Sequence, residues 1–202
     1  MTIRAQITVR GVVQGVGFRP FVFSHAQRRA LKGQVLNSSS GVLIDVEGEA
    51  CTIEEFIKEI KTNSPPLSLI ESVERSVNLD LAHYTDFRIV ESSANGRRFT
   101  HMSADVGTCD DCLKELFDPQ DRRYQYPFIN CTNCGPRFTI IEDIPYDRAQ
   151  TTMRDFEMCR ACRAEYEDPN DRRFHAELRR LWPQTLSIEC EWFGHRRRCG
   201  NH

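Results

Sequence analysis

The cysteines of this chain divide it into two parts that must fold by different means. Eight of the nine cysteines lie after residue 100, and six of those eight form three Cys-x-x-Cys pairs. In a chain that starts without an apolar leader segment, clustered pairs indicate metal or redox chemistry more often than disulfides. The first part is nearly free of cysteine and needs a hydrophobic core of its own, for which about 90 residues are enough.

Composition excludes several classes of partner. The net charge of -2 and the pI of about 6.3 give no overall attraction to nucleic acid or to an anionic membrane. The sequence contains no run of about 18 apolar residues, the length a membrane helix needs. We therefore expect a cytoplasmic protein that binds neither membrane nor nucleic acid.

The first 91 residues alternate in a way that predicts strands separated by helices. The segments Gly33–Asn37 and Val42–Glu47 flank a Ser-Ser-Ser-Gly turn, which predicts a hairpin. Thr52, with Glu55 three residues later, predicts a capping box at the start of the second helix. The other expected elements are the strands Arg4–Val9, Leu69–Val77 and Phe87–Val90 and the helix Pro20–Leu31. The order βαββαβ, followed by a short fifth strand, predicts an α+β ferredoxin-like fold, with both helices on one face of an antiparallel sheet.

A glycine-rich loop joins the first expected strand to the first expected helix. It holds three glycines in seven residues, at positions 11, 15 and 17, and is followed by Arg19 and Pro20. Such a loop at a helix N-terminus favours anions. Arg19 there opposes the helix dipole by a few tenths to about 1 kcal/mol unless an anion lies beside it. Pro20 suits the first helical position, and we expect the Arg19 side chain to be exposed. The alternative is a tight turn with an exposed arginine; the spacing matches neither a Walker loop nor a dinucleotide fingerprint.

Asn37 ends the second expected strand. If that strand runs beside the first, the Asn37 amide lies near the glycine loop and can hold a water in line with a bound phosphorus atom. Phosphoryl transfer mainly needs positioning and charge stabilisation, which one arginine, several amides and one asparagine can supply. The alternative is an ordinary turn residue.

The second part of the chain contains an internal repeat with a constant offset of fifty residues. Cys109-Asp-Asp-Cys112 and Cys159-Arg-Ala-Cys162 are each followed by a glutamate and by an Asp-Pro-x-Asp-Arg-Arg-aromatic segment. Each copy is expected to be stable only with help from outside the copy.

The first repeat carries the spacing of a four-thiolate zinc site. Cys109, Cys112, Cys131 and Cys134 follow the pattern Cys-x2-Cys-x18-Cys-x2-Cys. Four thiolates leave no open position on the metal, so we expect a structural Zn²⁺ that the region needs in order to fold. Redox dithiols and an iron–sulfur cluster are the alternatives.

The second repeat offers only half of such a site. Cys159 and Cys162 are in place, but the equivalent later positions hold Leu181 and Gln184. The remaining candidates lack ligand-pair spacing, and we expect an unfilled half-site and about one Zn²⁺ per chain. His101 and His175 are interpreted as ordinary surface or hydrogen-bonded histidines. The candidates without ligand-pair spacing are Cys190, Cys199, His175 and His195.

Residues 1–91 resemble the acylphosphatase family. The segment Gly11-Val-Val-Gln-Gly-Val-Gly-Phe-Arg19 is similar to its phosphate loop and arginine, and Gly33-Gln-Val-Leu-Asn37 to its second signature. The resemblance implies that Arg19 and the loop bind a phosphoryl group, that Asn37 orients the attacking water, and that no covalent phosphoenzyme forms. The loop residues so implied are Val13, Gln14, Gly15, Val16, Gly17 and Phe18.

Residues 99–177 resemble the hydrogenase-maturation carbamoyltransferases, the HypF family. The resemblance is carried by Cys131-Thr-Asn-Cys-Gly-Pro-Arg-Phe-Thr-Ile140, by Pro145-Tyr-Asp-Arg148 and by Thr151-Thr-Met153. It implies an enzyme that takes carbamoyl phosphate and ATP, makes a carbamoyl adenylate and carbamoylates the C-terminal cysteine of a partner maturation protein. That group becomes the cyanide ligands of [NiFe]-hydrogenase. The share of the first domain is hydrolysis of carbamoyl phosphate.

The resemblance stops after Glu177. The family continues with a fourth Cys-x-x-Cys and two further domains, whereas residues 178–202 have no periodicity. Our hypothesis is a frameshift or truncation near codon 178, so that the parts for ATP use and transfer are missing and the tail is disordered or frameshifted. We expect an acylphosphatase-like domain at 1–91, a linker at 92–98 and a tandem zinc-finger region at 99–177. The alternative function is a zinc-finger docking module without turnover.

Overall fold

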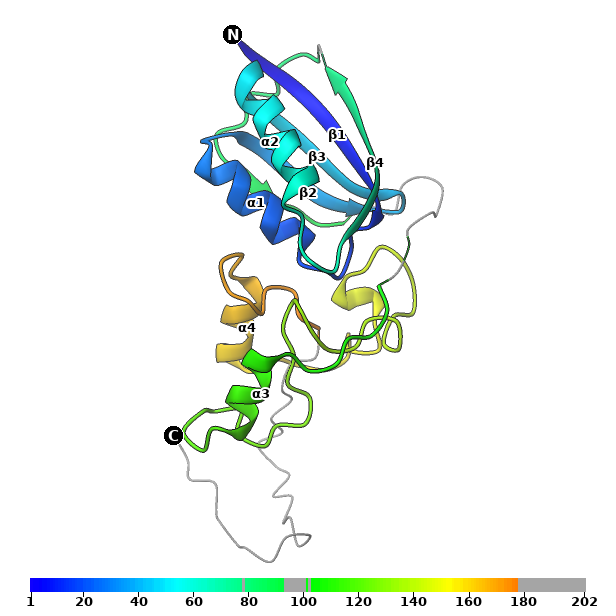
Figure 1. The fold of residues 1–202 in the computed structure, drawn as a ribbon, viewed down its shortest axis with the longest axis vertical. Coiled ribbons are helices and arrows are strands. Elements are labelled where there is room, and N and C mark those ends of the chain that lie inside the picture. Colours follow the sequence, from blue (N-terminus) through cyan, green and yellow to red (C-terminus); the bar gives the residue numbers. More distant parts are fainter. Residues whose placement is uncertain (78, 93–100, 102, 178–202) are drawn as a thin grey trace, which may run out of the picture.

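The structure is a computed structural model that describes residues 1–77, 79–92, 101 and 103–177. An N-terminal domain (residues 2–89) stands above a cysteine-rich region (residues 103–177), which continues from its lower end in Figure 1. Most of the expected linker and the whole tail lie outside the described residues, as do Leu181, Gln184, Cys190, His195 and Cys199.

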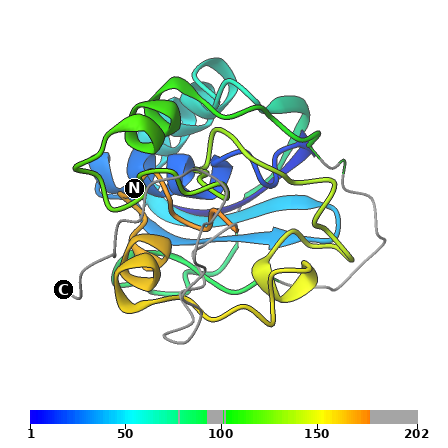
Figure 2. The same cartoon turned by 90° about the horizontal axis from the view of Figure 1, so that it is seen from below.

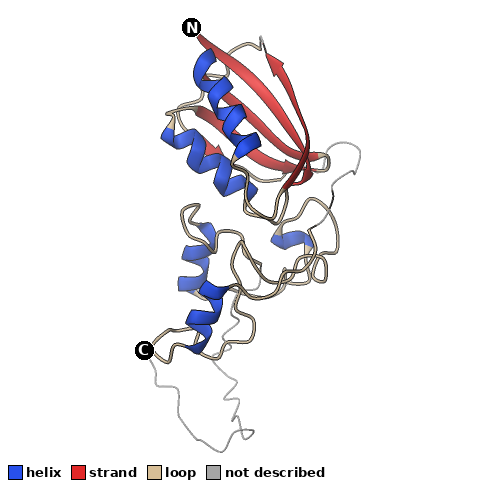
Figure 3. Ribbon diagram, in the orientation of Figure 1, coloured by secondary structure: helices blue, strands red, loops and turns tan. Residues whose placement is uncertain are grey.

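The N-terminal domain is an α+β sandwich of one sheet and two helices. The sheet has the strand order β4-β1-β3-β2-β5, and both helices cover the same face of it (Figure 3). Alternating apolar residues of the strands pack against α1 and α2 to form a single core, in which Ile7, Ile44 and Phe56 are fully buried. The elements are β1 (Thr2–Val12), α1 (Phe18–Arg28), β2 (Lys32–Ser38), β3 (Gly41–Glu49), α2 (Ala50–Thr62), β4 (Leu69–Val77) and β5 (Phe87–Ile89).

The ferredoxin-like fold is confirmed, with two corrections to the sheet. β2 does not run beside β1, because β3 pairs with both and lies between them. The sheet is also not wholly antiparallel, since β5 pairs with β2 in parallel. A helical crossover returns the chain parallel to the strand before it, so α1 leaves a gap between β1 and β2 that the hairpin strand β3 fills.

Both helices begin earlier than the sequence patterns predict. α1 begins at Phe18, after Gly17 in the left-handed conformation, so Pro20 is its third residue and not its first. α2 begins at Ala50 after Glu49, and Thr52 lies inside the helix and provides no capping side chain. Within the described residues, no helix combines the length and apolar character that a membrane crossing requires.

The cysteine-rich region consists of two interlocked copies of the repeat. α3 (Asp110–Phe117) and α4 (Arg160–Glu167) follow Cys109 and Cys159, and η1 (Arg148–Gln150) lies in the connection between the copies. Seen from below, α3 and α4 lie on one side of the region and η1 on the other (Figure 2). Arginines of each copy pair with the glutamate of the other: Arg122 and Arg123 with Glu165, Arg172 and Arg173 with Glu115.

Candidate functional site

The glycine loop borders one pocket and carries a row of main-chain amides beside it. Gly15 and Gly17 have φ angles of 70° and 75°, which only glycine adopts readily. Within the described residues, the amides of positions 15 to 18 have no main-chain hydrogen-bond acceptor. No acidic residue lies in the first turn of α1, and no side chain caps it. The loop and the helix N-terminus are therefore suited to an anion, and no acidic side chain of the first turn occupies that place.

Gln14, a predicted loop residue, has a structural role for its side chain. Its Nε2 donates to the Ser38 and Gly41 carbonyls at 2.8 and 2.9 Å, and its Oε1 accepts from the Tyr146 amide at 2.9 Å. The side chain is 1% exposed. Gln14 therefore ties the loop to the β2–β3 turn and to the cysteine-rich region.

Arg19 is buried, and the expectation of an exposed side chain was wrong. It is 7% exposed, and its Nη2 donates to Asp147 Oδ1 at 2.9 Å and to His175 Nδ1 at 3.0 Å. Both partners come from the cysteine-rich region, which covers the loop and removes the guanidinium from solvent. The guanidinium carries five N–H donors, so these two contacts leave donors for an anion in the pocket.

Asn37 reaches the same pocket from the end of β2. Its Nδ2 donates to the Tyr146 carbonyl at 3.1 Å, and the residue is 1% exposed. Its Oδ1 is buried and lacks a hydrogen-bond partner within the described residues. A buried amide oxygen without a partner costs roughly 1–3 kcal/mol, so the position favours a water or ligand donor.

The pocket lies where the N-terminal domain meets the cysteine-rich region. It encloses about 30 Å³, and roughly 10–15 Å³ is enough for one water molecule. The pocket that Asn37 lines is thus large enough for a water. The walls include Gly15, Gly17, Arg19 and Asn37 from the domain, and Thr132, Arg137, Tyr146, His175 and Glu177 from the region below.

Two titratable side chains in the pocket wall have strongly shifted pKa values. Burial, and then the charge of Arg19, lower the pKa of His175 to about 3, so its ring is neutral and Nδ1 accepts from Arg19. The ring stacks on Tyr166 and Phe174. Burial raises the pKa of Glu177 to about 8, even with Arg148 nearby. His175 is therefore a hydrogen-bonded histidine beside the site.

The four predicted cysteines of the first repeat converge. Successive sulfurs are 3.6 Å (Cys109–Cys131), 3.8 Å (Cys131–Cys134) and 3.6 Å (Cys134–Cys112) apart, and all four lie within 4.8 Å of one another. These are not disulfides, whose sulfurs are about 2.05 Å apart. A tetrahedral zinc with Zn–S of about 2.3 Å requires S···S of about 3.8 Å. The donor set and its spacing fit a four-thiolate metal site.

Contacts among the clustered sulfurs shift the pKa values of two of the cysteines in opposite directions. Hydrogen bonds with Cys112 and then with Cys131 lower the pKa of Cys134 to about 3. Hydrogen bonds with Cys112 and then with Cys134 raise the pKa of Cys131. Arg172 of the second repeat donates from Nη1 to Cys112 Sγ at 3.2 Å. Cys159 and Cys162 are also free thiols, but no third ligand joins them within the described residues.

The sequence reasoning did not assign to the site three residues of the pocket wall, Arg137, Tyr146 and His175, or the Arg19 partner Asp147. All come from the cysteine-rich region, at least 95 positions after Asn37 or Arg19. Arg137 and the Tyr146-Asp147 pair do stand in segments that carry the family resemblance, although the zinc site does not need them. Polar residues in these segments that the zinc site does not need were the signal in the sequence for a second role.

Comparison with known proteins agrees with this architecture. Residues 5–89 match the acylphosphatase family model, and residues 108–141 and 158–178 match the HypF finger model. The acylphosphatase of Bacillus pumilus is 42% identical over 82 residues, which cover 40% of this chain and 90% of that protein.

Longer relatives match both parts of the chain. Carbamoyltransferase HypF of Rhodobacter capsulatus is 49% identical over 172 residues, 85% of this chain and 23% of the relative. A crystal structure of full-length HypF in a phosphate- and nucleotide-bound form is 58% identical, with a TM-score of 0.82 over 87% of this chain and 23% of that one. This chain thus spans about a quarter of the length of these relatives. It belongs to the HypF family and combines an acylphosphatase domain with a HypF finger region.

Proposed function

We propose that the N-terminal domain hydrolyses acyl phosphates, with carbamoyl phosphate as the physiological substrate. The observation that carries this proposal is the convergence of three features on one pocket. These are the loop amides without acceptors, the buried Arg19 and the buried Asn37 Oδ1 without a partner. Together they supply charge for a phosphoryl group and an acceptor for one water.

The proposed reaction is a direct attack by water on phosphorus. Arg19 and the amides of the loop bind the phosphoryl oxygens and stabilise the charge that they carry in the transition state. Asn37 Oδ1 accepts a hydrogen bond from the attacking water and holds it opposite the leaving group. The P–O bond to the carbamoyl group breaks, so inorganic phosphate and carbamate leave, and no phosphoenzyme forms.

For the whole pathway we propose a role in carbamoyl transfer during [NiFe]-hydrogenase maturation. The support is the similarity to HypF carbamoyltransferases, of which this chain spans about a quarter. In this scheme the carbamoyl group is transferred, at the expense of ATP, to the C-terminal cysteine of a partner maturation protein. The clustered free thiols favour the reducing cytoplasm as the location.

For the metal we propose one structural Zn²⁺. The ligands would be Cys109, Cys112, Cys131 and Cys134, because four soft thiolates at tetrahedral spacing suit zinc. With all four positions filled by protein, the ion holds the finger together and takes no part in hydrolysis.

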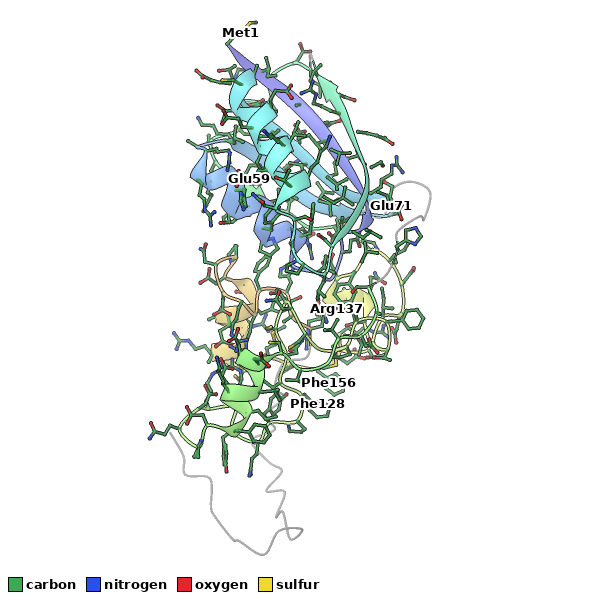
Figure 4. All side chains as sticks on the ribbon, viewed as in Figure 1. Met1, Glu59, Glu71, Phe128, Arg137 and Phe156 are labelled. Atoms are coloured by element: carbon green, nitrogen blue, oxygen red, sulfur yellow. The ribbon has the colours of Figure 1, made fainter. Side chains whose placement is uncertain are left out.

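The test is turnover of benzoyl phosphate and carbamoyl phosphate by the purified chain, followed by release of inorganic phosphate. We expect hydrolysis of both, and a chain that binds phosphate without turnover would refute the enzyme proposal. That result would instead favour a docking module, and the exposed aromatic side chains of the cysteine-rich region support this second candidate. Phe117, Phe128 and Phe138 are 70%, 57% and 66% exposed, and Figure 4 shows Phe128 on the part of the cysteine-rich region farther from the N-terminal domain.

A further inference from the structure

Arg137 connects the cysteine-rich region directly to the glycine loop. Figure 4 shows it on the side of this region that faces the N-terminal domain. Its Nε donates to the Gly15 carbonyl at 2.6 Å, across 122 positions of sequence. The residue is 3% exposed, so the contact is sheltered from water.

The segment that carries two of the metal-site cysteines holds the rest of the guanidinium. Nη1 donates to the Gly135 carbonyl at 2.6 Å and Nη2 to the Thr132 carbonyl at 2.7 Å. The main-chain amide of Arg137 donates to Asp105 Oδ1 at 2.7 Å. Cys131 and Cys134 lie in the same turn, so the fold of the cysteine site fixes where Arg137 can reach.

The contact with Gly15 bears on the anion site through the geometry of the peptide unit. In a trans peptide the C=O of one residue and the N–H of the next point in opposite directions. An arginine that holds the Gly15 carbonyl therefore also fixes the direction of the Val16 amide, which points the opposite way. Gly15, with φ of 70°, has the freedom to rotate away if this contact is lost.

We propose that Arg137 is a positioning residue for phosphate binding, which orients the Val16 amide of the loop from the cysteine-rich region. This role rests on the proposed hydrolysis and adds to it a dependence on the finger. Arg137 also brings a positive charge to the pocket wall, since its three carbonyl acceptors do not neutralise it. By reciprocity of binding, whatever disorders the cysteine site weakens phosphate binding, and bound phosphate stabilises the cysteine site.

The experiment compares Arg137→Gln and Arg137→Lys with the unchanged chain. Inorganic phosphate affinity is measured by calorimetry, the Val16 amide by its ¹⁵N–¹H shift, and turnover with benzoyl phosphate. We expect Arg137→Gln to weaken phosphate binding about tenfold or more and to move the Val16 signal, and Arg137→Lys to recover part of the affinity. The matched control is Arg123→Gln, a buried arginine of the same region that pairs with Glu165 away from the pocket.

The outcomes separate this inference from the proposed function. If the unchanged chain neither binds phosphate nor turns over benzoyl phosphate, both proposals are wrong. If it does both and Arg137→Gln binds phosphate equally well, only the positioning role is overturned. If Arg137→Gln does not fold, two other comparisons of phosphate affinity replace it: Arg137→Lys against the unchanged chain, and the unchanged chain before and after zinc removal. Equal affinities within both comparisons would overturn the positioning role.

Discussion

Arg19 illustrates how one residue joins two parts of the chain. Its position at the second residue of α1 places a cation where the helix dipole disfavours one, and its side chain is nevertheless buried. Asp147 offsets this cost in part, at 2.9 Å. An anion in the pocket would offset the rest, which is why the residue belongs to the site and not to the helix surface.

For Arg19→Ala we expect loss of acyl phosphate turnover by roughly 100-fold or more, because a donor to the developing charge is removed. Since Arg19 is buried and pairs with Asp147, we also expect a lower melting temperature. Turnover and thermal unfolding measure the two effects separately. The control is Arg10→Ala, which removes the exposed ion pair between Arg10 on β1 and Glu74 on β4 and should keep full turnover. Retained activity in Arg19→Ala would contradict the assignment.

Asn37→Ala tests the water rather than the phosphoryl group. We expect a large fall in kcat, on the order of 100-fold, because the amide oxygen that holds the water is removed. Affinity for inorganic phosphate should change little, since Arg19 and the loop amides remain. Steady-state kinetics and phosphate calorimetry give the two numbers. Loss of phosphate binding together with turnover would show instead that Asn37 only supports the loop through its 3.1 Å bond to Tyr146.

At the scale of elements, each repeat completes its neighbour. Arg172 donates to Cys112 and Arg122 donates to Cys162, at 3.2 and 3.6 Å, so cations of one copy face the thiols of the other. Such N–H···S contacts reduce the charge of a thiolate cluster and shield it from solvent. The helices α3 and α4 have eight residues each, which is too short for a helix to be stable alone, and this pairing stabilises them.

For the metal we expect elemental analysis to find about one zinc per chain. Cys131→Ser should abolish it and lower stability sharply, because a structural site contributes its binding energy to folding. Cys51→Ser, at an exposed cysteine in α2, should retain it. Two zinc ions per chain would show that Cys159 and Cys162 belong to a second site that other residues complete.

At the scale of the molecule, the contact between domain and finger is expected to be sensitive to acid. The pKa of His175 is about 3 in the folded chain, below its ordinary value of 6.5. Between these values only the unfolded chain takes up the proton, so stability is lost as the pH falls from 6.5 toward 3. The loss is at most about 1.4 kcal/mol per pH unit.

His175→Asn should remove this slope while keeping an acceptor near Arg19, and asparagine tolerates the φ of 50° at this position. Denaturant unfolding at several pH values, read as the difference between the two chains, measures the effect. Glu177 is present in both chains, so its effect cancels when the two stabilities are subtracted. Its raised pKa acts in the opposite sense and lowers stability as the pH rises toward 8. His83→Asn, at an exposed histidine, is the control, and an equal change in slope there would contradict the role of His175.

Local patterns predicted more of the elements than of the site. The strand Leu69–Val77 and the β2–β3 hairpin follow from alternation and turn chemistry, and the cysteine cluster follows from spacing. The starts of α1 and α2 were wrong by two residues each, because the helical conformation already begins after Gly17 and after Glu49. Periodicity reports which residues face the core, but it says little about where a helix ends.

The amino-acid sequence by itself determined the elements, the four-cysteine group and the candidate roles of Arg19 and Asn37, because each rests on residues close together in the chain or on regular spacing. Only the tertiary structure decided that Arg19 is buried against Asp147 and His175, and that Arg137 holds the Gly15 carbonyl. These contacts join residues more than a hundred positions apart. No local pattern encodes such a contact, since it depends on how two separately folded surfaces pack.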